Sequence, residues 1–164
     1  MTSQKYAHLE AIRGVQAELT QVLDGMDYCL DWKPESDVWS AREVVYHLLD
    51  TPTGGLHRVL RGMFAGTLNE YDLWADLSNL TPERQGYDMA QVKRDVDRFF
   101  QDLEEALDMA SEADFEHKSV LVHFKNRDGR TEPRTAGMLL ERGFGRHWRE
   151  HLEQLRALRE SLGV

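Results

Sequence analysis

Apolar side chains recur every three or four positions in long stretches of the chain, the spacing that places them on one face of an α-helix. The first stretch runs from about Lys5 to Leu23, with Leu9, Ile12, Val15, Leu19 and Leu23 on its apolar face. We expect two further long helices, from about Ala90 to Met109 and from about Thr135 to Leu162. Together these stretches indicate a largely helical protein.

A fourth helix follows a clear start signal. Glu43 comes three residues after Ser40, the spacing of a capping box, so a helix is expected from near Ala41. Its apolar stripe includes Val44, Val45, Leu48 and Leu49. Because proline lacks a backbone donor and crowds the preceding turn, Pro52 should kink this helix or split it.

The segments between the helices carry other signals. From Met63 to Tyr87 glycine and proline interrupt the period, which indicates a long crossing connection with short helical turns. Residues 119–124, the turn sequence Asn126-Arg-Asp-Gly129 and residues 130–132 indicate a small hairpin. The sequence therefore predicts an all-α fold, a four-helix bundle with a long crossover between helices 2 and 3 and a β-like insertion before helix 4. Residues 1–164 are expected to form one domain.

The composition of the chain limits the classes of molecule that the protein is expected to bind. The formal net charge of −9 repels phosphate groups, and no basic stripe with interleaved aromatics is present, so neither nucleic acid nor an anionic membrane is an expected partner. No stretch resembles a secretory signal or a membrane span, so we expect a cytoplasmic protein. The single cysteine, Cys29, excludes an intrachain disulfide and a Cys-x-x-Cys site, and its expected role is a small buried side chain.

Histidine spacing supplies the candidate chemistry. His147 and His151 lie four residues apart in the last helix and therefore project from one face, where both can bind one metal ion. His47 lies among apolar neighbours in the second helix and needs a hydrogen-bond partner or a metal. Three protein ligands would leave a coordination position open for a reactive water or thiol. The alternative is a hydrogen-bonded core His47 and two surface histidines.

Residues one turn from these histidines are candidates for supporting roles. Asp50 would orient a ligand or cap the helix, and Gln154 would be a polar pocket residue or routine packing. Thr51, Gly54 and Gly55 would leave space beside His47, which suits a substrate cavity or a helix kink. Three other assignments concern aromatics: Tyr71 and Trp74 would cover the pocket mouth or form a satellite core, and Trp39 is expected to be a packing residue.

Two segments resemble the signature regions of the DinB-like (YfiT-like) superfamily: the opening of the second helix, Trp39-Ser-Ala-Arg-Glu-Val-Val-Tyr-His47-Leu, and the closing His147-x-x-x-His151-x-x-Gln154. The order of elements agrees with that family over nearly the whole chain. The resemblance implies a four-helix bundle whose divalent metal is bound by one histidine of helix 2 and two of the last helix, here His47, His147 and His151. Pro52 and the Gly54-Gly55 pair depart from the family pattern and would alter the pocket.

The same resemblance implies zinc or nickel as the metal, a homodimer, and, from characterised relatives, transfer of a low-molecular-weight thiol to a small electrophile. A metal-dependent S-transferase is therefore the leading hypothesis. Two alternatives stay open: a metal-dependent hydrolase that uses water as the nucleophile, and a non-catalytic bundle that binds a ligand or dimerises.

Overall fold

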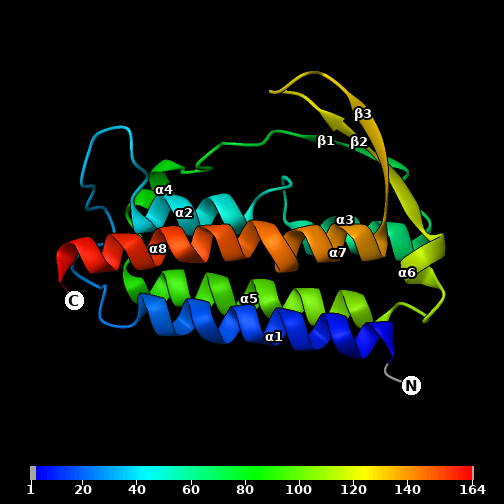
Figure 1. Ribbon diagram of the computed structural model, residues 1–164, viewed down its shortest axis with the longest axis horizontal. Coiled ribbons are helices and arrows are strands. Elements are labelled where there is room, and N and C mark those ends of the chain that lie inside the picture. The colour runs from blue at the N-terminus through cyan, green and yellow to red at the C-terminus, as the bar shows by residue number, and fades with distance from the viewer. Residues whose placement is uncertain (1–2, 164) are drawn as a thin grey trace.

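The computed structural model describes residues 3–163 and is built mainly of helices (Figure 1). The helices are α1 (Gln4–Leu23), α2 (Ala41–Leu49), α3 (Leu56–Ala65), α4 (Pro82–Gln85), α5 (Met89–Asp108), α6 (Asp114–His117), α7 (Ala136–Arg142), the π-helical turn η1 (Gly143–His147) and α8 (Trp148–Leu162). The strands are β1 (Glu70–Leu73), β2 (Ser119–Phe124) and β3 (Thr131–Thr135).

The long helices pack side by side along the longest axis of the molecule (Figure 1). α1 contacts α5 and α8, α3 contacts α5, and α2 contacts α8. Their inward faces form one core of buried apolar side chains, including Val15 and Leu19 of α1, Phe100 and Leu103 of α5, and Leu152 of α8. The long helices predicted from apolar periodicity are therefore present, and they begin and end close to the predicted positions.

The second predicted helix is divided as Pro52 indicated. Ser40 accepts a hydrogen bond from the Glu43 backbone, and the Glu43 side chain accepts one from the Ser40 backbone, so the capping box is present and α2 starts at Ala41. α2 ends at Leu49, and α3 starts only at Leu56. The intervening turn needs glycine: Gly55 has φ 93° and ψ 151°, a conformation that side-chain-bearing residues scarcely adopt. His47 therefore lies near a helix end rather than mid-helix.

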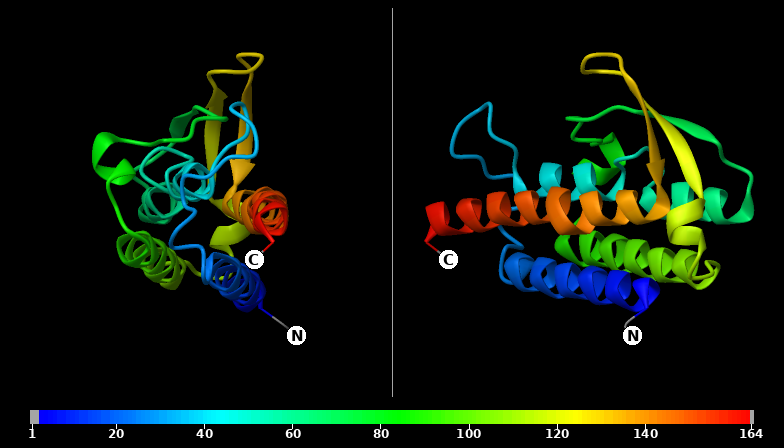
Figure 2. Two further views of the ribbon diagram at one scale, coloured as in Figure 1. Left: turned by 90° about the vertical axis from the view of Figure 1, so that its left-hand side faces the viewer. Right: turned by 45° about the vertical axis from the view of Figure 1, so that its right-hand side comes forward.

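A three-stranded sheet corrects the all-α prediction. β2 and β3 form the expected antiparallel hairpin, and β1 adds to β2 in parallel, with Tyr71 opposite Val122. The sheet lies on the side of α3 and α7, away from α1 (Figure 2). β1 comes from the long connection, where short helical turns were expected. Its polar and apolar residues alternate over only four positions, too short a run to identify a strand, and its partner strand lies about 50 residues further along the chain.

The last predicted helix also differs from expectation. Five residues of π-helix, Gly143–His147, separate α7 from α8, and the three segments form one continuous helix. A π-turn accommodates an extra residue and so rotates everything after it relative to the preceding helix, by roughly 100° per residue. This irregularity ends at one candidate ligand, His147, and lies four residues before the other, His151.

Candidate metal centre

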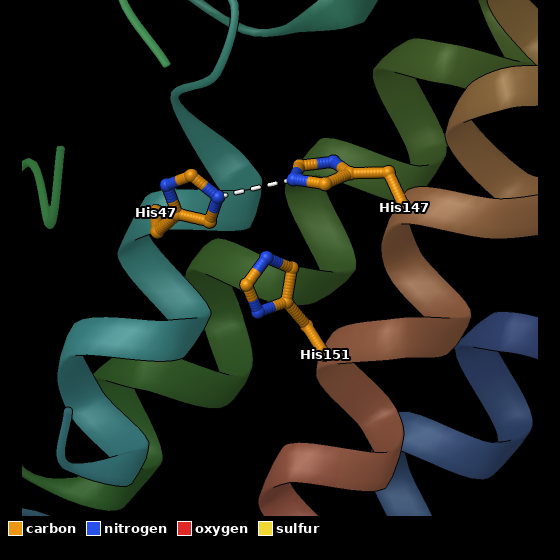
Figure 3. Close-up of side chains that lie close together, drawn as sticks. All are labelled: His47, His147 and His151. Atoms are coloured by element: carbon orange, nitrogen blue, oxygen red, sulfur yellow. Dashed lines mark hydrogen bonds between the residues drawn. The ribbon is translucent and has the colours of Figure 1, made fainter. Parts of the chain in front are cut away.

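Three histidines from three elements converge on one space between α2 and the η1–α8 junction (Figure 3). His47 lies on α2, His147 ends η1, and His151 lies in the first turn of α8. One ring nitrogen from each of the three lies within 4.8 Å of the others. The ring centroids are 4.7 to 5.1 Å apart. The residues that spacing and resemblance singled out are therefore neighbours in space.

A contact on the far side of the His47 ring determines which of its two nitrogens carries the hydrogen. Nδ1 of His47 lies 2.7 Å from the carbonyl oxygen of Leu77, and a carbonyl can only accept, so Nδ1 carries the hydrogen and donates it. In the neutral ring Nε2 then keeps its lone pair, and it faces the other histidines. Such an outer hydrogen bond is the usual support of a metal-binding histidine.

The segment that provides this carbonyl is itself tied to α2. Asn79 donates through Nδ2 to the Tyr46 and His47 carbonyls, at 3.3 and 3.4 Å, and to Thr51 Oγ1 at 3.1 Å. Thr51 Oγ1 in turn lies 3.4 Å from His47 Nδ1. Thr51 is therefore a polar neighbour of the candidate site. No sequence signal separated Asn79 from the other polar residues of the long connection.

Gln154 supports the second ring in a similar way. Its Oε1 lies 2.8 Å from Nδ1 of His151, which places an acceptor beside that nitrogen and leaves Nε2 of His151 free for other contacts. The Gln154 side chain thus belongs to the polar surroundings of the site, the first of the two roles considered for it.

Two ring nitrogens meet at the centre of the cluster. Nε2 of His47 and Nε2 of His147 are 3.1 Å apart. Burial, the largest cause, lowers the pKa of both rings, to about 3 for His147, with smaller contributions from neighbouring positive charge. Both rings are therefore neutral near pH 7, and the neutral His147 ring can donate an Nε2 hydrogen to the lone pair of His47 Nε2.

This arrangement fits a divalent metal ion. Neutral imidazoles are ligands that zinc and nickel accept, and nitrogens bound tetrahedrally to zinc at about 2.1 Å lie about 3.4 Å apart. The 3.1 Å separation and the 4.8 Å limit bracket that value. A metal at this point would replace the contact between the two nitrogens and accept a lone pair from each of them.

An aromatic side chain that was expected only to pack belongs to the same site. The Trp39 ring lies 4.8 Å from that of His47 and stacks with that of His151 at 6.3 Å, centroid to centroid. It covers one side of the cluster with an apolar surface. Periodicity could not identify this role, because Trp39 precedes the helix cap and follows no apolar stripe.

Other candidates lie apart from the histidines. Asp50 is the C-cap residue of α2, and its carboxylate accepts from the Gly54 backbone at 2.6 Å and from Arg84 at 3.2 Å, which braces the turn after the helix. It makes no hydrogen bond to a histidine within the described chain. Tyr71 is buried in β1 as part of the core, and Trp74 is 47% exposed.

A search of the described residues for a helix long and apolar enough to cross a membrane found none.

Comparison with known proteins identifies the family. Neither the curated proteins nor the solved structures contain a match to this chain. The family model of the DinB superfamily matches residues 11–155, a span that includes all three clustered histidines. Because this match covers most of the 164 residues, the chain belongs to the DinB superfamily.

Proposed function

We propose that His47, His147 and His151 bind one divalent metal ion, zinc or nickel, and that the protein is a metal-dependent S-transferase that joins a small thiol to an electrophile. The observation that carries the proposal is the convergence of three ring nitrogens within 4.8 Å, with the lone pair of His47 Nε2 directed toward the other two rings. Membership of the DinB superfamily supports the same reading and a four-helix-bundle description of the fold.

When bound, the metal would supply a Lewis-acid centre that lowers the pKa of a thiol or water in its open position. The chain's own residues do the rest. The Leu77 carbonyl holds the His47 ring in one tautomer, Gln154 orients His151, and Trp39 shields one side of the cluster from water. The small thiol would lie on the side of the cluster that Trp39 does not cover. Its sulfur would displace the leaving group of the electrophile.

Conjugation of thiols to monochlorobimane tests the transferase activity. Metal-loaded protein should accelerate the reaction with at least one of several small thiols, and chelation should abolish the acceleration. His151→Ala should behave like chelated protein, whereas His123→Ala, which changes a histidine outside the cluster, should retain full activity. If metal-loaded protein accelerates no conjugation but hydrolyses test esters, the proposed transferase activity is wrong and a hydrolase activity takes its place.

The acidic charge of −9 supports a small-molecule substrate rather than a nucleic acid. We also propose that the protein is cytoplasmic and that it is a homodimer, the second of these as the resemblance implies. Light scattering coupled to gel filtration should give a mass of about twice the 19.0 kDa of one chain.

A further inference from the structure

The β2–β3 hairpin carries positive charge in an otherwise acidic chain. Residues 118–134 contain five Lys or Arg and two Asp or Glu, a formal charge of +3 against −9 for the whole chain. The hairpin loop extends along the long axis of the molecule in the direction of α2 (Figure 1). Glu70, Asp72 and Asp76 of the adjoining segment pair with His123, Lys125 and Arg127 and offset most of this charge locally. Where an anion would bind depends on the contacts of individual arginines.

The hairpin tip is bound to the segment that supports His47. The Asn126 side chain donates to the Ala75 carbonyl and accepts from the Ala75 backbone N–H at 2.9 Å. The next residue, Arg127, pairs with Asp76 at 3.6 Å. Leu77, adjacent to Asp76, is the residue whose carbonyl accepts from His47. Asp76, the ion-pair partner of Arg127, is therefore adjacent in the chain to a residue that contacts the cluster, and the charge of Arg127 contributes to the lowered pKa of His147.

Arg127 has hydrogen-bonding capacity to spare. Its guanidinium makes no hydrogen bond to any of residues 3–163, its distance to Asp76 is longer than a hydrogen bond, and its side chain is 54% exposed. The other hairpin arginines are occupied. Arg134 is buried and hydrogen-bonded to Glu132, and Arg130 lies 3.2 Å from Glu132 and over the Phe124 ring. The five N–H donors of Arg127 are thus available to a ligand.

We propose that Arg127 is an anion-recognition residue of the metal site, so that the small molecule bound there carries a carboxylate or a similar anionic group. The inference rests on the proposed function, since it assigns a substrate class to that same site. A ligand carboxylate would take the place of Asp76 and bind the guanidinium through two parallel hydrogen bonds. Three neutral ligands add no negative charge that would oppose an approaching anion.

Binding of matched thiols to cobalt-loaded protein tests this proposal, read from the sulfur-to-cobalt absorption band. The probes are 3-mercaptopropionate and its methyl ester, which differ in the carboxylate. Arg127→Gln should weaken binding of the acid by threefold to tenfold, as expected for one partly exposed charge pair, and leave the ester unchanged. Asp76→Asn, which retains a residue tolerant of the positive φ of 66° at this position, should tighten binding of the acid. Arg130→Gln is the matched control with no expected effect.

A second arm locates the anionic group, because either the thiol or the electrophile could carry it. The rates of alkylation of the bound thiol by iodoacetate and by iodoacetamide are compared, and an effect of Arg127→Gln confined to iodoacetate assigns the anion to the electrophile. Equal acid-to-ester and iodoacetate-to-iodoacetamide ratios in wild type and Arg127→Gln would overturn the inference while leaving the metal site intact. Failure of the protein to bind cobalt at all would overturn the proposed function and this inference with it.

Discussion

The lowered pKa of His147 predicts a loss of stability in mild acid for the metal-free protein. An unfolded histidine takes up a proton near pH 6.5, whereas folded His147 does so only near pH 3. Between these values the unfolded state binds more protons, so stability falls as pH falls from 6.5 toward 3. From pH 7 to pH 5 the loss attributable to His147 is at most about 2 kcal/mol, 1.5 pH units at about 1.4 kcal/mol each.

Urea unfolding of chelator-treated protein at the two pH values measures this loss. His147→Gln keeps a polar side chain that does not titrate, so its free energy of unfolding should fall by about 2 kcal/mol less than that of the wild type between pH 7 and pH 5. Carboxylates and His47, whose pKa is also lowered, titrate in both proteins and cancel in the comparison. An equal fall in the two proteins would refute the argument that His147 is held neutral by its surroundings.

Two further predictions concern stability. Tyr46→Phe removes a buried hydroxyl that donates to Asp95 at 2.6 Å. The loss of this charge-assisted hydrogen bond should lower the free energy of unfolding by about 2 kcal/mol, measured by urea unfolding at pH 7. A change below about 0.5 kcal/mol would contradict this prediction. Gly55→Ala should cost about 2 to 3 kcal/mol, since φ 93° suits only glycine and the new Cβ would lie 2.5 Å from the His57 ring. Gly129→Ala, with φ 72° and open space around it, should cost only about 1 kcal/mol, and equal losses for the two glycine variants would refute the steric argument.

Helical periodicity predicted most of the architecture because the long helices bury one face each. The apolar positions of α1 and α5 lie in the core as their spacing indicated, and Pro52 ended the second helix for the reason given. These features depend on local sequence, which is why they could be read from it.

The pairing of strands distant in the sequence and the change of helical register in the last helix could not be predicted from local sequence. β1 exists because its backbone pairs with β2, and nothing within Glu70–Leu73 announces that partner. The π-turn at Gly143–His147 leaves the composition of the last helix unchanged and alters only which residues share a face.

In the candidate site, too, some residues could be predicted from the sequence and others could not. The three histidines could be named from their spacing and from the family resemblance, whereas their neighbours Trp39, Leu77 and Asn79 could not. These residues reach the site from a loop or a helix cap, and two of the contacts involve a backbone carbonyl or an unremarkable amide. A sequence pattern carries little information about such contacts, because any residue supplies a carbonyl.

Metal content of untagged protein tests the central claim most directly. Wild type purified without chelators should contain about one zinc or nickel ion per chain, and His147→Ala should lose most of it, because three ligands that act together bind far more tightly than two. His117→Ala serves as the matched control, since His117 lies outside the cluster, and it should keep the metal. Wild-type protein that is metal-free, with a melting temperature unaffected by added zinc or nickel, would contradict the account.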